Sequence, residues 1–483
     1  MSKNVPITIA YGDGIGPEIM EAVVLILKEA HARIQVETVE IGGRAHHHGF
    51  QNGIPDSCME IIRKNKILLK APLTTPQGGG FKSVNVTLRR ALGLYANVRP
   101  CISYHPLIQT KHPKMDVVIV RENEEGLYTG IEHRQTLDAY QSLKLVTRAG
   151  CEKIVKFAFD YAIQNGRKKV SCFTKDNIMK MTDGLFHKVF NEIGEFYPEI
   201  EKDHYIIDIG SARLANKPEI FDVIVTDNLY GDIISDITSE ISGSVGLAGS
   251  ANIGSEFAMF EAVHGSAPDI ADLGIANPSG LLNGAMMMLS HIGQHDVAEK
   301  IRNAWLKTIE DGVHTVDIFN EKTSKIKVST NEFALAVVSN IRRQEREAIK
   351  HSAAKATTKP RDIKLSSTKE KKLLIGIDVY FDAKKSTAEF AEQLQKITEN
   401  TKLKLQMLES KGLKLWPSDK YTKNSVSDYW RGRFLPEGIE KKASHSYIVE
   451  LLSAFDQANL DFIKTDNLYT FDGIPGFSLA QGE

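Results

Sequence analysis

Apolar and polar residues alternate in a regular way over roughly the first 340 residues of the chain. Residues 17–30 show helical spacing, with a proline near the first turn. Between such segments lie short apolar runs that have the length and composition of buried strands. The runs span residues 7–10, 66–70, 117–120, 169–173 and 223–226. This alternation predicts an α/β fold, although it does not determine the strand order.

The pattern weakens after Arg343. Residues 350–372 hold seven lysines and one arginine against Asp362 and Glu370, and no aromatic residue, which is typical of a solvated linker. A second structured pattern follows. It consists of a strand at 373–381, a helix at 387–400, a strand at 403–408, a helix at 444–458 and a strand at 460–465. With one more strand between about 412 and 435, this pattern predicts a βαββαβ, ferredoxin-like α+β domain.

Composition and charge narrow the functional classes. The chain has 483 residues, 60 basic and 61 acidic, so it gives no reason to expect general binding to nucleic acid or membranes. Its four cysteines lie far apart, which argues against a disulfide framework or a zinc site and for a reducing compartment. No signal peptide or membrane span is predicted. We therefore expect a soluble, cytoplasmic protein of two or three domains.

A glycine-rich loop at residues 11–18 follows the first strand and opens the first helix. Its glycines stand at 12, 14 and 16, which is not the spacing of the dinucleotide fingerprint. Glu37 and Glu40 are weak candidates for the acidic residue that closes that motif. The loop is therefore interpreted as a tight strand-to-helix turn, and a Rossmann domain is not expected.

Two carboxylates carry the clearest chemical signal. Asp232 and Asp236 are four residues apart, so on a helix they project from one face, one turn apart. A bound cation would relieve their repulsion, and oxygen ligands suit Mg²⁺ or Mn²⁺. The spacing alone fits a solvated acidic helix face equally well. The strand at 223–226 just before them favours a site at the carboxyl end of a strand.

Residues 228–246, with the pattern N-x-x-G-D-x-x-S-D and spaced glycines, resemble a signature of the isocitrate/isopropylmalate dehydrogenase family. The segments 12–18 and 261–268 are similar to the same family, and the resemblance covers about residues 4–340. It implies a two-domain α/β fold. A large cofactor-binding domain would comprise 1–98 and 250–343, and a small substrate, metal and dimerisation domain 99–249; a linker at 344–372 and the domain at 373–483 follow. It also implies metal ligands at Asp208, Asp232 and Asp236, with Asp208 supplied by the partner subunit.

The same resemblance implies the substrate site. Arginine forks suit planar carboxylates. Ser83 and Asn85 stand where isocitrate enzymes carry a serine and an asparagine that hold the distal carboxylate. Isopropylmalate enzymes carry larger apolar groups near this loop instead, and an apolar pocket would leave that carboxylate unpaired. Isocitrate is therefore expected, while homoisocitrate, isopropylmalate and tartrate stay open. The expected substrate-binding residues are Thr75, Ser83, Asn85, Arg89, Arg99 and Arg121.

Tyr128 and Lys180 match the catalytic tyrosine and lysine of the family. In the implied reaction a base removes the C2 hydroxyl proton as hydride leaves C2, and CO₂ is then lost. The tyrosine can protonate the resulting enolate at C3. Lys180 is expected to come from the other subunit, so the resemblance implies a homodimer, or a higher homo-oligomer, with shared active sites.

The cofactor prediction depends on one loop. Asp269 and Ile270 stand where NADP-using members tend to carry Lys-Tyr, and an aspartate can accept a hydrogen bond from a free ribose 2′-hydroxyl but repels a phosphate. We therefore predict NAD. The expected cofactor-binding residues are His264, Gly265, Ser266, Ala267, Asp269, Ile270 and Asn277.

Three features remain outside this assignment. The histidines at 46–48 point in different directions if helical, and they are interpreted as solvent-facing or helix-terminal and not as a metal site. A catalytically silent subunit that regulates a partner is a rival interpretation, which the complete set of motif residues disfavours. The C-terminal domain is expected to act in assembly or regulation. Ser83 is a candidate phosphosite, because added charge would repel a substrate carboxylate.

Overall fold

The computed structural model describes residues 4–75, 82–346, 361, 363, 369–417, 428–438 and 442–481. The chain divides into two compact units. One comprises residues 1–129 and 144–363, and the other comprises residues 130–143 and 364–483. Each unit has its own sheet and its own hydrophobic core.

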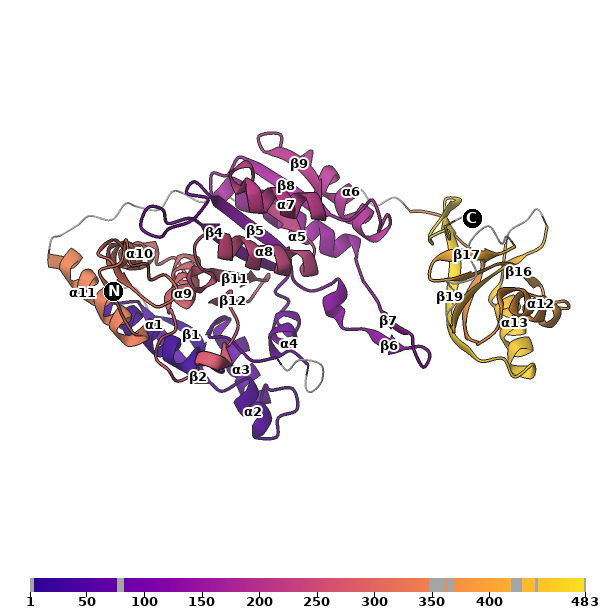
Figure 1. Cartoon of the computed structure of the whole chain (residues 1–483), viewed down its shortest axis with the longest axis horizontal. Helices are drawn as coiled ribbons and strands as arrows, with labels where there is room; N and C mark the ends of the chain where they lie inside the picture. The colour runs from indigo at the N-terminus through magenta and orange to yellow at the C-terminus, as the bar shows by residue number, and fades with distance from the viewer. Residues whose placement is uncertain are drawn as a thin grey trace. The chain divides into compact units, whose positions relative to one another are not determined.

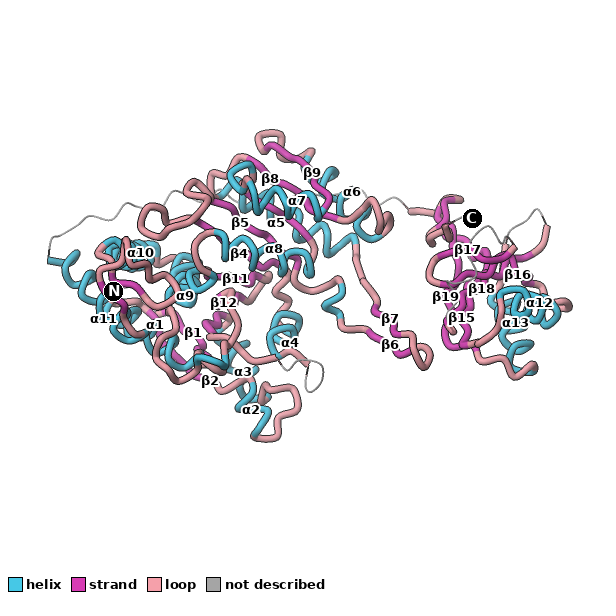
Figure 2. The backbone as a smooth tube through the Cα atoms, in the orientation of Figure 1, coloured by secondary structure: helices cyan, strands magenta, loops and turns pink. Residues whose placement is uncertain are grey.

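The first unit is built on a ten-stranded sheet with the order β2-β1-β3-β12-β11-β4-β5-β10-β8-β9 (Figures 1 and 2). Strands pair in parallel from β2 to β12 and again from β5 to β9, whereas β11 and β4 run antiparallel to their neighbours in the middle. The strands are β1 Val5–Ala10, β2 Ile34–Val39, β3 Ile67–Lys70, β4 Ala96–Ile102, β5 Asp116–Glu122, β8 Lys169–Thr174, β9 Glu201–Ile206, β10 Val223–Thr226, β11 Gly249–Ile253 and β12 Ala258–Ala262.

Helices cover both halves of this sheet. Helix α9 packs on β11 and β12 and contacts α1 and α10, while α5 packs on β5 and β10 and α8 on β4 and β5. The helices are α1 Gly16–Glu29, α2 Gly43–His47, α3 Asp56–Asn65, α4 Val84–Ala91, α5 Arg148–Gln164, α6 Thr182–Gly194, α7 Ile207–Asn216, α8 Asn228–Ile241, α9 Ser279–His291, α10 His295–Glu310 and α11 Thr330–Arg346. A small parallel pair joins β13 Val313–His314 to β14 Ile326–Lys327.

The α/β prediction is confirmed for this unit. The five predicted strands are present with ends within two residues of those expected, and the predicted first helix is α1. Helix α11 continues to Arg346, so the start of the expected linker is helical, while most of residues 347–368 lie outside the described part of the chain. The expected division at residues 98 and 250 falls on the β4–β11 pair, and it stays a prediction.

The glycine loop is a tight turn, as predicted. Gly12 and Gly14 have φ values of +71° and +57°. A Cβ on Gly14 would lie 2.0 Å from the carbonyl oxygen of Ser266, and one on Gly12 would lie 2.2 Å from that of Pro72. Only glycine fits both the backbone conformation and these close approaches. The loop therefore brings the start of α1 against the segment around Ser266.

The second unit contains an antiparallel sheet with the order β17-β16-β18-β15-β19-β20. The four strands β16-β18-β15-β19 interleave the two βαβ halves, as expected for a ferredoxin-like fold. The region predicted to hold one strand holds two, β17 and β18, and β20 adds another edge strand. The elements are β15 Lys372–Asp382, α12 Thr387–Ile397, β16 Leu403–Ser410, β17 Leu413–Trp416, β18 Tyr429–Pro436, α13 His445–Gln457, β19 Phe462–Phe471 and β20 Ile474–Pro475.

The core of this second sheet follows from strand alternation. Ile377, Val379 and Phe381 on β15 point to one face and pack with Phe390 of α12 and Phe455 of α13. A capping box between Ser386 and Glu389 starts α12. A separate hairpin in the same unit joins β6 Glu132–Arg134 to β7 Tyr140–Ser142.

Two simpler expectations can also be checked. Helix α2 ends at His47, and His47 and His48 are exposed, so the histidine tract is helix-terminal as predicted. Across the described ranges, no helix is both long enough and apolar enough to cross a membrane.

Candidate active site

Most of the residues predicted to bind substrate line one pocket in the first unit. The pocket lies where β3, β4 and β12 meet helices α4 and α8. Its lining is strongly charged, which suits a polyanionic ligand with a cation. The predicted residues in its wall are Thr75, Ser83, Asn85, Arg89, Arg99, Tyr128, Asp232, Asp236, His264 and Gly265.

Helix α8 presents the two central carboxylates. It begins after Asp227, whose side chain caps the helix by accepting a hydrogen bond of 2.8 Å from the Tyr230 amide. Asp232 and Asp236 then follow one turn apart, and both face the pocket. Their side chains are 33% and 62% exposed, so both are open to a ligand. The spacing argument from the sequence therefore describes a real common face.

Arg121 and Arg99 converge on these carboxylates. Arg121 Nη1 lies 2.5 Å from Asp232 Oδ1, and Arg99 reaches Asp232 at 3.3 Å and Asp236 at 3.2 Å. Asn228 holds the rest of the Arg121 fork through its side-chain oxygen. Arg121 is fully buried and does not line the pocket, so in this structure it acts on Asp232 and not directly on the cavity.

The pKa values of the two carboxylates shift in opposite directions. Burial raises the pKa of Asp232, but Arg121 and Arg99 outweigh that effect and hold it below its usual value. At Asp236, burial outweighs the attraction of Arg99, so its pKa is raised. A divalent cation would replace the arginines as the compensating charge. The donor set, two adjacent carboxylates in a polar pocket, fits Mg²⁺ or Mn²⁺.

Tyr128 belongs to the same network. Its hydroxyl donates a hydrogen bond to Asp232 Oδ2, and the Arg121 guanidinium lies 4.9 Å from the centre of its ring. Burial first, and then the neighbouring Asp232, raise the pKa of Tyr128, although Arg121 lowers it. The phenol therefore keeps its proton at neutral pH and can act as an acid.

A buried ion cluster was not predicted from the sequence. Lys70 forms an ion pair with Glu261, which also accepts a hydrogen bond of 3.1 Å from Arg89 and one of 2.7 Å from Asn252. Lys70 and Glu261 line the pocket. Lys66 and Lys70 flank the same apolar run, so the run itself gave no sign that the lysine at position 70 is buried. The Glu261 carboxylate fixes Arg89 in position.

Several polar atoms around the pocket lack a protein partner. Asn85 Oδ1, Arg89 Nε and His264 Nε2 are buried and form no hydrogen bond. Unsatisfied buried polar atoms are costly, and a ligand can satisfy them. Thr75 and Ser83 meet at 3.1 Å between their hydroxyl groups at the same rim. These residues are therefore placed to receive a polar ligand.

Asp208 and the predicted catalytic lysine lie away from this pocket within one chain. Among the described residues, Asp208 is not within 4.8 Å of Asp232 and Asp236 as a three-ligand group. Asp208 is 67% exposed on α7, and Lys175 Nζ lies 2.8 Å from its Oδ2. Lys180 is also exposed, in the turn before α6. The structure thus makes Lys175 a second candidate for the catalytic lysine, a role that the family resemblance assigned to Lys180.

The predicted cofactor loop packs against the glycine turn. Ser266 accepts hydrogen bonds from the Thr74 hydroxyl at 2.8 Å and from the Ile15 amide at 2.9 Å. Ala267, with φ +40°, turns the chain into the short 3₁₀ helix Pro268–Ile270, where Asp269 is exposed. Asn277 bonds internally to Asp317 and Ser279. Burial lowers the pKa of His264, which lines the pocket.

Comparison with known proteins places both units. Residues 6–337 match the family model described as isocitrate/isopropylmalate dehydrogenase, and residues 372–483 match the one described as bacterial isocitrate dehydrogenase, C-terminal domain. A Rickettsia felis protein named isocitrate dehydrogenase [NADP] is 56% identical over the full length of both chains. A crystal structure of a Thermus thermophilus protein superposes with a TM-score of 0.92 at 39% identity, covering 99% of this chain and 96% of that one. The structure of isocitrate dehydrogenase from Methylococcus capsulatus has a TM-score of 0.67 at 47% identity, covering 70% of this chain and 99% of that one.

These relatives overturn the NAD prediction. Relatives from five Rickettsia species, at 54% to 56% identity over the whole chain, are named for NADP, as is the one from Thermus thermophilus. The prediction was wrong to treat Asp269 and Ile270 as decisive. Asp269 is exposed, and water and salt screen the repulsion that an exposed carboxylate exerts on a phosphate.

Proposed function

The chain belongs to the isocitrate/isopropylmalate dehydrogenase family, and from this premise we propose that it oxidises and decarboxylates isocitrate to 2-oxoglutarate with NADP as the hydride acceptor. The observation that carries the proposal is the single pocket that holds Arg89, Arg99, Tyr128, Asp232 and Asp236. The names of the full-length relatives agree with it.

The choice of isocitrate is supported by the rim of the pocket. Three carboxylates need more hydrogen-bond donors than a dicarboxylate with an apolar tail. Ser83, Asn85 and Thr75 supply polar groups at the rim, next to the unsatisfied Arg89 Nε. An isopropyl group placed there would leave the buried Asn85 Oδ1 and Arg89 Nε unpaired, at a cost of about 1–3 kcal/mol for each.

The chain's own residues then divide the work. Arg89 and Arg99 bind and orient the substrate carboxylates, and Asp232 and Asp236, with Asp208 of a second copy, would hold the metal. When bound, the divalent metal polarises the C2 oxygen and the nicotinamide accepts the hydride. A lysine takes the C2 hydroxyl proton. After CO₂ is lost, Tyr128 delivers its proton to C3, and its raised pKa keeps that proton available.

A second copy of the chain completes this site in our proposal. Helices α7 and α8 pack together and leave large apolar side chains exposed. Asp208 lies on the same surface helix, α7. Exposed apolar groups of this size suit burial against another protein surface. The exposed residues of these two helices are Ile209, Ile233 and Ile237.

Lys175 and Lys180 both remain candidates for the base that the second copy supplies. We favour Lys175, because it already pairs with Asp208, the carboxylate that would reach the same site. We expect Lys175→Ala to lower kcat by about 10²- to 10⁴-fold, the usual contribution of a general base. Lys180→Ala serves as the matched control and should stay within a few-fold of the wild type. The reverse outcome would restore Lys180.

Two measurements test the proposal as a whole. The first is NADPH formation with isocitrate, homoisocitrate, isopropylmalate and tartrate, with and without Mn²⁺, and with NAD in parallel. The highest kcat/KM should be with isocitrate and NADP, and a higher value for another substrate or cofactor would replace that part of the proposal. The second mixes inactive Lys175→Ala and Arg121→Ala chains. Recovered activity after subunit exchange indicates a shared site, and its absence contradicts one.

A further inference from the structure

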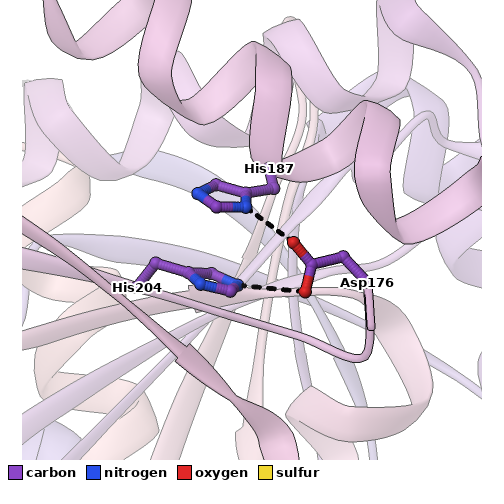
Figure 3. Close-up of side chains that lie close together, drawn as sticks. All are labelled: Asp176, His187 and His204. Atoms are coloured by element: carbon purple, nitrogen blue, oxygen red, sulfur yellow. Dashed lines mark hydrogen bonds and ion pairs between the residues drawn. The ribbon is translucent and has the colours of Figure 1, made fainter. Parts of the chain in front are cut away.

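A cluster of two histidines and one aspartate lies at the end of β8, apart from the pocket-lining residues. Asp176 stands in the turn that follows β8, His187 on helix α6 and His204 on strand β9 (Figure 3). These are three separate elements, and the residues are up to 28 positions apart in sequence. No short motif joins them, so only the fold brings them together.

The ligand atoms of this cluster already converge. One nitrogen from each imidazole and one carboxylate oxygen lie within 4.8 Å of one another. Asp176 Oδ2 is 2.7 Å from His187 Nδ1, and Asp176 Oδ1 is 3.8 Å from His204 Nε2 (Figure 3). Around a tetrahedral ion with bonds of about 2.0–2.1 Å, such atoms would be about 3.3 Å apart. The observed distances, each to a different oxygen of Asp176, lie on either side of that value, so the side chains would have to shift for one oxygen and both nitrogens to share an ion.

The imidazole rings of His187 and His204 stack on each other. Their centroids are 3.7 Å apart and their planes differ by 12°. Two protonated rings stacked in this way would repel each other. Burial, and then the charge of His187, lower the pKa of His204. Although burial raises the pKa of Asp176, the two histidines hold it below its usual value, so the carboxylate is anionic.

The cluster is accessible, and its immediate surroundings are favourable. The three side chains are between 20% and 27% exposed, so an ion could enter from solvent. Thr174 places its hydroxyl 2.8 Å from His204 Nε2 and would turn aside or hydrogen-bond a metal-bound water. Asp203 adds negative charge next to His204. Lys169 offsets part of that charge, because its Nζ lies 2.6 Å from Asp203 Oδ2.

We propose that Asp176, His187 and His204 form a second metal site, selective for a d-block dication such as Zn²⁺, distinct from the carboxylate site at Asp232 and Asp236. Imidazole nitrogens with one carboxylate suit zinc, iron(II) and cobalt, while Mg²⁺ prefers oxygen ligands and octahedral geometry. The chain would thus separate two metals by ligand type. An ion in this site would tie β9 and α6 to the turn that carries Lys175.

Without an ion, the cluster has a simpler explanation. Asp176 accepts a hydrogen bond from His187, and Thr174 bonds His204, so the three groups can satisfy one another. That arrangement predicts weak zinc binding that does not depend on both histidines together. The two explanations therefore differ in affinity, in stoichiometry and in the effect of single substitutions.

The test uses the full chain stripped of metal, with excess Mg²⁺ present to occupy oxygen-ligand sites. Zn²⁺ affinity is measured by competition with a chromophoric chelator, and Co²⁺ absorption reports ligand geometry. We expect one tight Zn²⁺ per chain and an intense visible Co²⁺ spectrum of low coordination number. His187→Gln and His204→Gln should each weaken Zn²⁺ binding by at least about tenfold. His47→Gln, in the exposed histidine tract, is the matched control and should bind as the wild type does.

Zinc-dependent thermal stabilisation provides a second readout, because an ion that binds the folded chain raises Tm. Zn²⁺ should raise the Tm of the wild type and of His47→Gln. It should raise the Tm of His187→Gln and His204→Gln by less than half as much. Equal Zn²⁺ affinity and equal Tm shifts in wild type, His187→Gln and His204→Gln would overturn the proposal. A loss confined to His47→Gln would do so too, since it would place the zinc at the histidine tract.

Discussion

Each unit of the chain holds a cluster of arginines and carboxylates, but the two clusters differ in how exposed their carboxylates are. In the first unit, Arg99 and Arg121 meet Asp232 and Asp236, whose side chains are 33% and 62% exposed. In the second unit, Arg431 and Arg433 meet Asp378 and Glu409, which are 3% and 8% exposed. Arg99, Arg121 and Arg433 are buried, and the Arg431 side chain is 12% exposed.

The difference lies in what remains open. Arg433 binds both oxygens of Asp378 at 2.9 and 3.0 Å, donates to the Ser478 carbonyl and lies 4.6 Å from the centre of the Phe477 ring. The charge of Arg433 is therefore compensated by Asp378 within the same unit. A guanidinium nitrogen without a hydrogen bond occurs in both units, at Arg89 Nε beside the pocket of the first and at Arg431 Nε in the second. Asp232 and Asp236 line that pocket and are open to a ligand, whereas Asp378 and Glu409 are buried. Buried charge alone therefore does not identify a binding site, but open carboxylates next to a pocket do.

The largest expected effect is on the second cluster. Arg433→Ala should destabilise the C-terminal unit by about 3–5 kcal/mol, because it leaves Asp378 buried with less compensation. Hydrogen exchange of peptides from β15 and β18 would measure this locally. Lys464→Ala, which breaks an ion pair with the 47%-exposed Asp466, is the control and should cost less than about 1 kcal/mol. Normal hydrogen exchange in Arg433→Ala together with impaired kinetics would break the comparison, since it would make this cluster a functional one.

The strands of both units were predictable because each is a local pattern. The run at 223–226 matches β10 residue for residue, and residues 373–381 match β15 within one residue at each end. The strand order was not predictable, because β12 pairs with β3, a strand that is far away in the sequence. Strand β17 has four residues, as β10 does, but it alternates apolar residues with a lysine and so lacks the continuous apolar run that revealed β10.

The site was predictable only where a motif is local. Asp232 and Asp236 follow from their spacing on one helix, and the arginines from the family resemblance. Glu261 meets Arg89 from 172 positions away, and His187 and His204 face Asp176 from different elements. Such contacts depend on the fold, and no sequence period encodes them. Lys175 lies five residues from Lys180, and only its ion pair with Asp208 distinguishes it.

The next effect concerns the first cluster. Arg121→Ala should lower kcat/KM by about 10²- to 10³-fold, the usual loss when a preorganised charge is removed from an active site. Arg99 still compensates Asp232, so the loss of stability should be smaller than for Arg433→Ala. Steady-state kinetics with isocitrate, together with a urea titration, would separate the two effects. Arg33→Ala, which removes a surface pair with Asp296, is the control and should leave kcat/KM unchanged. An Arg121→Ala variant that is strongly destabilised but keeps a normal kcat/KM would remove the distinction between the clusters.

The smallest expected effect concerns Glu122, a buried carboxyl group that contacts backbone amides and not arginines. Glu122 follows Arg121 on β5, and its carboxylate is held by the backbone amides of Glu124 and Glu125, at 2.7 and 3.0 Å. Burial raises the pKa of Glu122 to about 7, although those amides lower it. The folded chain thus keeps a proton that the unfolded chain releases above its ordinary pKa of 4.5. The contribution of Glu122 to the free energy of unfolding must therefore fall as pH rises from about 4.5 to about 7.

Glu122→Gln removes this dependence while keeping an acceptor for the two amides. Relative to the wild type, the variant should gain up to about 3 kcal/mol between pH 5 and pH 8, with the gain appearing on the alkaline side. Urea titrations at both pH values, followed by circular dichroism, would measure it. Asp296→Asn is a control of opposite sign, because the hydrogen bond from Arg33 holds the pKa of Asp296 at about 2 and the pair stabilises the fold only while the carboxylate is charged. A pH-independent difference between Glu122→Gln and wild type would mean that backbone amides alone keep a buried carboxylate charged, as the arginines do for Asp232.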